Sequence, residues 1–373
     1  MVALEYGKPL PAKGRRPGSV AVYGSNGIVG QHDDHLIDGP AIVVGRKGSV
    51  GKVCWSGGSC WPIDTTYYVS PQVQCDLKWV FYLLKEKKLS RLNSATGVPG
   101  LNRNDAYLLS VATPPLAEQR KIAAILSSVD EAIEKTQAVI EQVQVVKRGL
   151  MQELLTKGLP GRHKRFKRTE IGEIPADWEV APLGGVLEKV IDYRGKTPPK
   201  SESGIPLLSA ANIGMGRVKM EPRQFISPTD YDAWTTRGLT RPGDILITTE
   251  APVGHVAPYP ENGTYQISRR VMALRPNAGQ VLSKYLIFVL LADDAQSRLL
   301  DKTRGSTVPR VLKPDILGLP IPMPSLSEQA EISHHLDSTN SYSDALMSEC
   351  EFLHVTKQAL MSVLLTGELR VTP

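Results

Sequence analysis

The sequence predicts two α/β (α+β) domains in pseudo-symmetric tandem, each followed by one long α-helix, with the two helices paired as an antiparallel coiled coil. The first observation is a duplication: residues 118–156 align with residues 328–366 at a constant offset of 210 and without a gap, and thirteen of the 39 pairs are identical. The second is a heptad pattern within both copies. The third is that a stretch rich in Gly, Pro and β-forming residues precedes each copy.

The composition is that of a soluble protein long enough for two hydrophobic cores, with 373 residues, 41% hydrophobic and 22% charged. No run of 18 apolar residues exists, so no transmembrane helix is expected. The N-terminus lacks the apolar segment of a signal peptide. The four cysteines show neither C-x-x-C spacing nor a nearby His cluster, so we expect no zinc site, no disulfide framework and a cytoplasmic location.

Changes in composition divide the chain into five segments. The boundaries that we predict are 1–113 for the first domain, 114–157 for the first long helix, 158–168 for a basic linker, 169–323 for the second domain, and 324–373 for the second long helix and a tail.

The two β-rich domains also align with each other, with small shifts in offset. Ile42–Val53 matches Ile245–Val256 at an offset of 203, and Lys78–Leu84 matches Lys284–Leu290 at 206. The dipeptide at 98–99 matches that at 308–309 at 210. A changing offset indicates insertions in loops, which tolerate them, whereas the long helices keep a fixed length.

Each long helix has apolar residues at alternating spacings of four and three, as in a heptad repeat that faces a partner helix. Prolines precede both helices, as helix starts allow. About forty residues of helix span roughly 60 Å. Two ordinary amphipathic helices, each packed on its own domain, are the alternative, but an average helix has only about 11–12 residues. The predicted coiled-coil interface is Ile122, Leu126, Val129, Ile133, Ile140, Val143, Leu150, Leu154, Ile332, Leu336, Leu346, Leu353, Leu360 and Leu364.

Polar residues interrupt this pattern, more often in the second helix, at Thr339, Ser343 and Lys357. Lys147 and Lys357 occupy the same register of the two copies. We interpret both as long side chains that bury their methylenes and extend their ammonium groups to solvent.

Basic residues concentrate between the first helix and the second domain. Lys157–Arg168 holds six positive charges and no acid, which equals the net charge of the whole chain, +6. A basic surface favours a polyanion such as nucleic acid. A solvated linker that only separates two domains explains the same residues equally well.

The glycine-rich turn that begins at Gly45 is a candidate DNA contact through Arg46, Lys47, Ser49 and Lys52. Arginine can bind guanine or phosphate through two hydrogen bonds, and glycine lets the backbone approach a ligand closely. A tight hairpin with solvated charges is the alternative. The turn is not a nucleotide-binding P-loop, because five residues separate its glycines and Val53 stands where Ser or Thr would bind magnesium.

Other candidate DNA contacts are weaker. Ser25 and Asn26 could offer an amide to adenine, although their surroundings are favoured as ordinary turn chemistry. The remaining candidates are polar or basic residues of the second domain: Lys196, Arg269, Arg270, Arg304 and Thr307. The polar loop at 303–307 of the second domain has a counterpart at 93–96 of the first domain.

Catalytic motifs are absent from the sequence. The Thr-Pro-Pro stretches at 113–115 and 197–199 are not the Asp/Asn-Pro-Pro-aromatic motif of adenine methyltransferases, and neither HExxH nor GxSxG occurs. An enzyme in its own right is therefore disfavoured.

Four stretches together resemble the specificity subunits of type I restriction-modification systems. They are Tyr23–Gly27, Gly45–Lys52, Ile171–Val180 at the start of the second half, and Pro115–Ile122, which Pro324–Gln329 repeats. No one of these motifs is very specific, but their order and the duplication are, and the resemblance covers nearly the full length.

The resemblance implies two target recognition domains, each followed by a spacer helix, that read a split DNA sequence across a fixed gap. It implies a subunit without chemistry of its own. The partners would be double-stranded DNA, two modification subunits that methylate adenine with S-adenosylmethionine, and restriction subunits that contain the motor and nuclease. ATP and Mg²⁺ would likewise belong to partner subunits. In this family the two termini meet and close a pseudo-symmetric ring.

One segment departs from the internal symmetry. Thr169–Val190, which contains Trp178, precedes Tyr193–Lys196, whereas the first domain starts almost at the matching Glu5–Lys8. We therefore expect the first recognition domain to be N-terminally short.

A different class of function fits the helices alone. A coiled-coil scaffold that bridges two protein partners and binds no DNA would need the same spacers. The basic linker and the glycine-rich basic turn argue against it. The recognised bases and the gap length do not follow from the sequence, because readout depends on loop geometry and on DNA shape.

Overall fold

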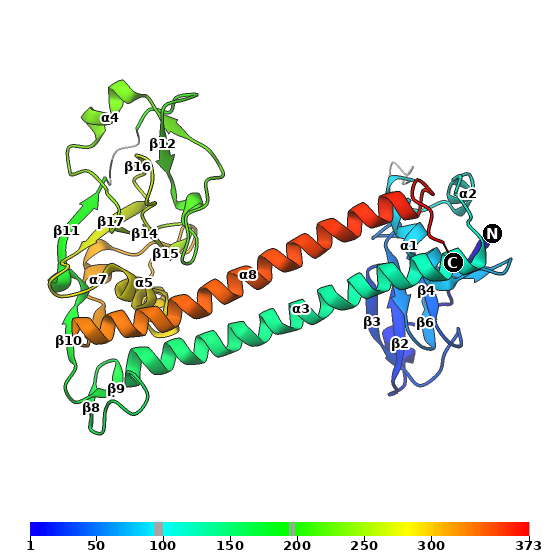
Figure 1. Ribbon diagram of the computed structural model, residues 1–373, viewed down its shortest axis with the longest axis horizontal. Helices are drawn as coiled ribbons and strands as arrows, with labels where there is room; N and C mark the ends of the chain where they lie inside the picture. Colours follow the sequence, from blue (N-terminus) through cyan, green and yellow to red (C-terminus); the bar gives the residue numbers. More distant parts are fainter. Residues whose placement is uncertain (93–99, 194, 196–197, 373) are drawn as a thin grey trace. The chain divides into compact units, whose positions relative to one another are not determined.

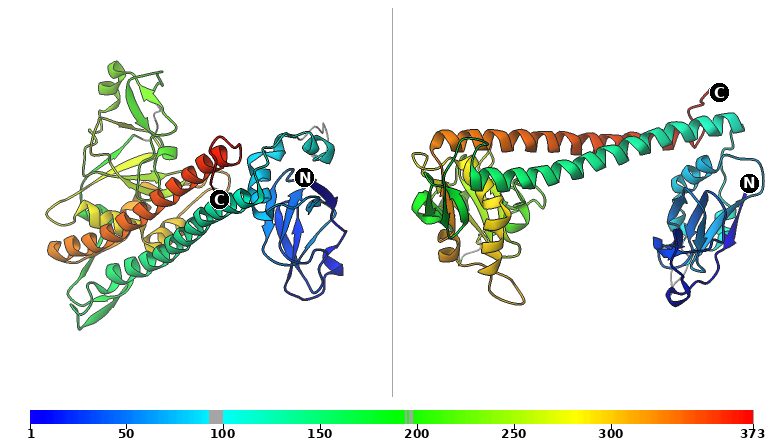
Figure 2. Two further views of the ribbon diagram at one scale, coloured as in Figure 1. Left: turned by 45° about the vertical axis from the view of Figure 1, so that its right-hand side comes forward. Right: turned by 90° about the horizontal axis from the view of Figure 1, so that it is seen from below.

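The computed structural model describes residues 1–92, 100–193, 195 and 198–372, and it divides into two compact units (Figure 1). Unit 1 comprises Met1–Val139 and Leu346–Pro373, and unit 2 comprises Ile140–Ala345. The boundary crosses both long helices, α3 (Leu116–Lys157) and α8 (Leu326–Leu364). Each unit therefore contains one globular part, the start of one long helix and the end of the other. Both helices are unbroken in every view (Figure 2).

Unit 1 contains a four-stranded antiparallel sheet in the order β1-β7-β4-β5 and a three-stranded sheet in the order β3-β2-β6. In the smaller sheet β2 is antiparallel to β3 and parallel to β6. The elements are β1 (Val2–Tyr6), β2 (Val20–Gly24), β3 (Gly27–His32), β4 (Ala41–Gly45), β5 (Val53–Ser56), β6 (Cys60–Pro62), β7 (Thr66–Pro71), α1 (Leu77–Glu86) and α2 (Arg103–Tyr107).

Unit 2 contains sheets of the same two kinds, β11-β17-β14-β15 and β13-β12-β16. Its elements are β8 (Phe166–Thr169), β9 (Gly172–Pro175), β10 (Glu179–Pro182), β11 (Leu187–Asp192), β12 (Ile205–Leu208), β13 (Phe225–Ile226), α4 (Pro228–Trp234), β14 (Ile245–Thr249), β15 (Val253–Pro258), β16 (Gln266–Ile267), β17 (Val271–Pro276), α5 (Ser283–Leu291), α6 (Asp293–Asp301), α7 (Lys313–Leu317) and β18 (Pro320–Met323).

The four-stranded and three-stranded sheets of the two globular parts share one topology. The order and direction of pairing match throughout, including the parallel pairs β2/β6 and β12/β16. Two of the three internal matches are confirmed, because the first runs from β4 to the start of β5 and from β14 into β15, and the second lies within α1 and α5. Residues 98–99 of the third match lie outside the described residues. The predicted fold class is thereby confirmed as a tandem of α/β domains with long helices.

Strands β8, β9, β10 and β18 have no counterparts among the described residues of unit 1. In unit 2, β8 pairs with β9, and β10 pairs with β18 immediately before α8. Of these strands, β9 and β10 lie within Thr169–Val190, the segment that the sequence alignment left unmatched.

The heptad pattern of the long helices is confirmed by burial. The predicted coiled-coil positions are all buried or half-buried, whereas the residues between them in the middle of α3 are mostly exposed. Within unit 1 the helices run antiparallel, since Asp130 meets Lys357 and Gln137 meets Cys350. Their ends also enter the globular cores: Ile122 and Leu126 join the core of unit 1, and Ile332 and Leu336 join that of unit 2. Both packing modes considered from the sequence therefore occur in the same helices.

Lys357 does not extend to solvent, which corrects the sequence interpretation. Its ammonium group pairs with Asp130 on the other long helix, and Tyr82 of α1 donates to the same carboxylate at 2.7 Å. Burial opposes ionisation of Asp130, yet the hydrogen bonds from Lys357 and Tyr82 hold its pKa below the usual range. This network fastens α1 to both long helices within unit 1. The equivalent pair in unit 2 is Lys147 with Asn340, so the charge pair is not repeated.

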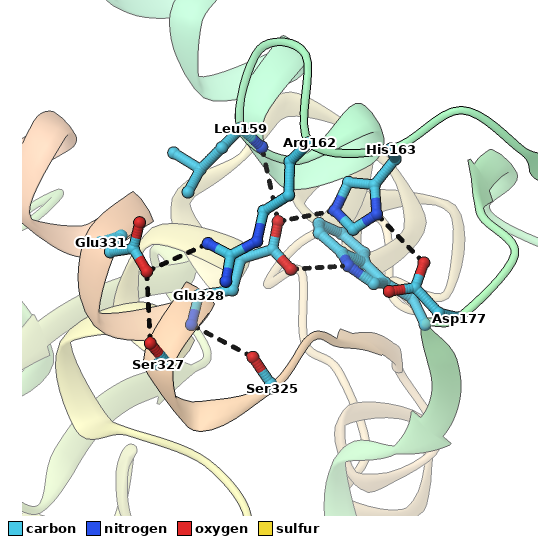
Figure 3. Close-up of polar contacts among 9 residues, drawn as sticks. Leu159, Arg162, His163, Asp177, Ser325, Ser327, Glu328 and Glu331 are labelled. Atoms are coloured by element: carbon cyan, nitrogen blue, oxygen red, sulfur yellow. Dashed lines mark hydrogen bonds and ion pairs between the residues drawn. The ribbon is translucent and has the colours of Figure 1, made fainter.

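The basic linker is a folded part of unit 2 (Figure 3). Arg162 pairs with Glu331 at 3.0 Å, and Lys167 pairs with Glu179 at 3.3 Å. His163 is buried between Glu328 and Asp177, with ring nitrogens 2.7 Å and 3.1 Å from the two carboxylates. Neither alternative from the sequence describes the linker fully, because part of its basic charge is neutralised within the unit.

A buried glutamate near the start of each long helix binds the segment that follows the other helix. Glu328 accepts hydrogen bonds from Leu159 N at 3.4 Å, His163 Nε2 at 2.7 Å and Trp178 Nε1 at 3.1 Å (Figure 3). Its counterpart Glu118 accepts two from the Arg370 guanidinium, at 2.9 and 2.7 Å, and one from Val371 N at 3.0 Å. In each unit, a carboxylate at the same position of the duplicated sequence thus holds the start of one long helix to the segment that follows the other.

The neighbouring glutamines repeat in the same way. Gln119 Oε1 accepts from Asp76 N at 2.9 Å, at the start of α1, and Gln329 Oε1 accepts from Leu282 N at 2.8 Å, at the start of α5. These amides satisfy backbone donors that a helix start leaves open. The repeated Glu-Gln pair therefore attaches each globular part to its long helix.

Within the described part of the chain, none of the helices combines the length and the apolarity that crossing a membrane requires.

Candidate nucleic-acid interface

Unit 2 contains a pocket of about 320 Å³ that three arginines and one glutamate line. We call it the arginine pocket, and its lining residues are Gly195, Thr249, Glu250, Arg269, Arg270, Arg310, Val311 and Leu312.

Three chain segments meet at the arginine pocket because backbone hydrogen bonds join them where β14 ends. Thr249 N donates to Arg270 O, and Val311 N donates to Thr249 O, both at 2.9 Å. Glu250 and Arg310 form an isolated antiparallel bridge. The pocket thus belongs to the fold and not to one flexible loop.

The charged groups of the arginine pocket differ in their partners. Arg270 Nε lies 3.0 Å from Glu250 Oε1, which neutralises part of the charge. Arg269 and Arg310 are exposed, and neither side chain has an ion pair within the described part of the chain. Two guanidinium groups are therefore available to a ligand that offers hydrogen-bond acceptors.

Unit 1 has the same backbone arrangement at the end of β4. Arg46 N and Lys47 N donate to Thr65 O at 2.9 and 3.1 Å, and Leu101 N donates to Arg46 O at 2.8 Å. Lys47 and Gly100 form an isolated antiparallel bridge. Residues that make the same backbone bonds in the two units are structurally equivalent. The equivalent residues of unit 1 and unit 2 are Arg46 and Thr249, Lys47 and Glu250, Thr65 and Arg270, Gly100 and Arg310, and Leu101 and Val311.

Equivalent backbone positions therefore present different charges in the two units. In unit 1 the basic residues are Arg46 and Lys47, which Thr249 and Glu250 replace in unit 2. In unit 2 the basic residues are Arg270 and Arg310, which Thr65 and Gly100 replace in unit 1. Two similar sites with different side chains are suited to two different ligand surfaces.

Arg46 is held firmly in unit 1. Its Nη2 donates to Asp64 O at 2.6 Å, and its guanidinium lies 5.2 Å from the ring centre of Tyr6 and 5.9 Å from that of Tyr67. Tyr6 is 50% exposed, so this stacked arginine lies at the surface. A guanidinium that is oriented beforehand loses less freedom on binding.

The other predicted contacts of unit 1 lie around the same turn. Gly45 N donates to Lys52 O at 2.8 Å, so Gly45–Lys52 is a closed turn that exposes Lys47 and partly exposes Ser49. Lys52 Nζ binds the backbone and side-chain oxygens of Asn26, both at 2.8 Å. Ser25 and Asn26 form the two-residue turn between β2 and β3.

Arg304 and Thr307 of unit 2 lie in the loop that leads to Arg310. Arg304 and Arg310 exchange two backbone hydrogen bonds, at 2.8 and 2.9 Å, which close this loop. The Arg304 side chain pairs with Asp315 at 3.4 Å, so neither Arg304 nor Thr307 lines the arginine pocket. Lys196 and the loop at 93–96 lie outside the described residues.

Comparison with known proteins decides the family. Residues 11–145 and 175–349 match the family described as type I restriction modification DNA specificity domain. The chain belongs to this family. It is 30% identical over 302 residues to the type I restriction enzyme MjaVIII specificity subunit of Methanocaldococcus jannaschii, which covers 79% of this chain and 70% of that protein. The EcoBI specificity subunit of Escherichia coli is 24% identical, covering 82% of this chain and 68% of that protein.

The fold agrees with this assignment. The crystal structure of the S subunit of a type I restriction-modification system from M. genitalium matches with a TM-score of 0.63 and 16% identity, over 100% of this chain and 94% of that one. Specificity subunits are non-catalytic, and catalysis belongs to partner subunits of the complex. The lack of catalytic motifs in the sequence is consistent with that role.

Sequence reasoning did not identify Glu250 and Arg310 as site residues. Arg310 directly follows the Val-Pro dipeptide that aligned with residues 98–99, so a longer alignment would have paired it with Gly100. An arginine at a position that is glycine in the other copy marks a difference in charge between the two copies. The pairing of Glu250 with Arg310 joins residues sixty positions apart, and only the fold reveals it.

Proposed function

We propose that this chain reads a bipartite DNA target with a fixed gap, one element through each unit, and directs adenine methylation and restriction by partner subunits. The supporting observation is the pair of equivalent sites, one at the end of β4 and one at the end of β14, which share backbone hydrogen bonds and differ in charge. The two spacer helices, 42 and 39 residues long, would hold the two readers at a constant separation.

The partners follow from the same proposal. Two modification subunits would supply S-adenosylmethionine-dependent methylation of adenine, and restriction subunits would supply ATP- and Mg²⁺-dependent translocation and cleavage. A chain with internal pseudo-symmetry offers each surface twice, which suits two copies of one partner. None of these groups would bind in this subunit.

Arg46→Ala tests the proposal. The complex of this chain with its modification subunit would be used to select methylated duplexes from a random library. The wild-type complex should select two short elements at one fixed gap. Arg46→Ala should relax or abolish one element and leave the other intact, because Arg46 lies in unit 1 alone.

Arg16→Ala is the matched control. Arg16 is also an exposed arginine of unit 1, paired with Asp33 at 2.7 Å, but it does not belong to the turn at Gly45–Lys52. It should leave both elements unchanged. Unaltered recognition of both elements by Arg46→Ala would contradict the role of this turn.

A further inference from the structure

The arginine pocket contains a carboxylate as well as arginines, and this combination restricts its ligand. A site that only neutralises a phosphate needs no acid, because a carboxylate repels the phosphate. Glu250 nevertheless faces the pocket, with Oε1 held by Arg270 at 3.0 Å. Its Oε2 has no hydrogen-bond partner within the described part of the chain, so this oxygen remains an acceptor for a ligand.

Glu250 and Arg310 stand next to each other. They are directly paired in an antiparallel bridge, and paired residues project their side chains to the same face with Cβ atoms about 4.5–5.5 Å apart. The site therefore offers a fork of donors beside a single acceptor. Backbone bonds on both sides fix this spacing, since Arg310 also exchanges hydrogen bonds with Arg304.

A G·C pair offers the complementary groups in the major groove. Guanine presents two neighbouring acceptors, N7 and O6, and cytosine presents the N4 amino donor beside them. An A·T pair presents an acceptor, a donor and an acceptor, so it has no adjacent acceptors for the arginine fork. Arginine to guanine and glutamate to cytosine are the contacts that base-edge chemistry favours.

On the basis of the proposed function, we propose that the arginine pocket reads a G·C pair in the half-site of unit 2. Arg310 binds guanine N7 and O6, and Glu250 accepts from cytosine N4. Arg270 acts as a positioning residue that holds the carboxylate. The equivalent positions in unit 1 are Gly100 and Lys47, so that unit does not read a G·C pair in this way.

The test is methylation of defined duplexes by the complex of the full chain with its modification subunit. A panel would carry each of the four base pairs at each position of both half-sites, and initial rates would be compared. The half-site of unit 2 is the one that Arg46→Ala leaves intact. We expect one position in it at which replacing G·C slows wild-type methylation about tenfold or more.

The variants separate base reading from phosphate binding. Arg310→Ala should remove the discrimination at that one position and leave it at the others. Arg310→Lys keeps the charge without the fork and should lose most of the same discrimination. Glu250→Gln should reduce discrimination against A·T, because an amide can bind adenine. Arg223→Ala, which alters an exposed arginine of unit 2 that pairs with Glu221 at 2.9 Å and does not line the pocket, should change none of these preferences.

Two results would overturn this inference while leaving the proposed function intact. One is a half-site of unit 2 without any G·C pair. The other is an Arg310→Ala complex that slows on all duplexes equally, as loss of a phosphate contact would cause. A wild-type complex without any sequence preference would instead overturn the proposed function.

Discussion

Replacing Glu328 by alanine should destabilise unit 2 strongly. Its side chain is only 2% exposed and receives three hydrogen bonds, from Leu159 N, His163 Nε2 and Trp178 Nε1 (Figure 3). These donors come from the linker and from the turn before β10. The substitution therefore removes an acceptor that holds both segments at the start of α8.

The magnitude follows from the donors that are left behind. A buried donor without a partner costs about 1–3 kcal/mol. The Trp178 indole is 1% exposed and cannot turn to solvent without leaving the core. His163 would keep Asp177, so it contributes less. We expect a loss of about 3–5 kcal/mol in the free energy of unfolding, which is the range for breaking a buried charged network.

The assay is hydrogen exchange of the backbone amides of β10 and β18, because these strands unfold with the segment that contains Trp178. Protection there should fall sharply in Glu328→Ala. Glu331→Ala is the matched control: it lies one turn away on the same helix, and its side chain is 50% exposed in an ion pair with Arg162. Equal exchange in the two variants would refute the reasoning that the buried carboxylate holds this part of unit 2 together.

Three further predictions concern unit 1 and the DNA. Lys357→Met leaves the half-buried carboxylate of Asp130 without its cation and should lower the free energy of unfolding, measured by chemical denaturation, by about 2–3 kcal/mol. Adding Asp130→Leu should recover most of this loss. A double variant no more stable than Lys357→Met would contradict this. Hydrogen bonds from Arg370 and Val371 lower the pKa of Glu118 to about 2 from an ordinary 4.5, so its stabilisation is complete above about pH 4.5 and is lost as the pH falls towards 2. The protection of the Val371 amide from hydrogen exchange, relative to an unfolded chain at the same pH, should therefore fall over that range. Glu118→Gln should remove this pH dependence. The logarithm of the DNA affinity of the complex should fall linearly with the logarithm of the salt concentration, and a flat response would argue for a scaffold that does not use phosphates.

The parts of the fold that repeat along the chain could be predicted from the sequence. The heptad pattern identified buried positions in both long helices because a period of 3.5 residues reflects local geometry. The alignments also identified the matching hairpins and the matching helices α1 and α5. These features follow from short-range spacing, which a sequence records directly.

The features that depend on side chains meeting across the chain could not be predicted. Lys357 appeared to be a solvent-facing spacer, because its partner Asp130 lies on another helix, 227 positions away. The basic linker appeared to be free, because Glu328 and Glu331 lie far along the sequence. The arginine pocket depends on the bridge between Glu250 and Arg310, which only tertiary folding brings together.

The most direct test of two independent readers is methylome sequencing of a host that expresses this chain with its neighbouring modification subunit. We predict one split motif, methylated on both strands, with two unlike elements and a constant gap. A palindromic motif, or a single defined element, would contradict the proposal that the two units read different sequences.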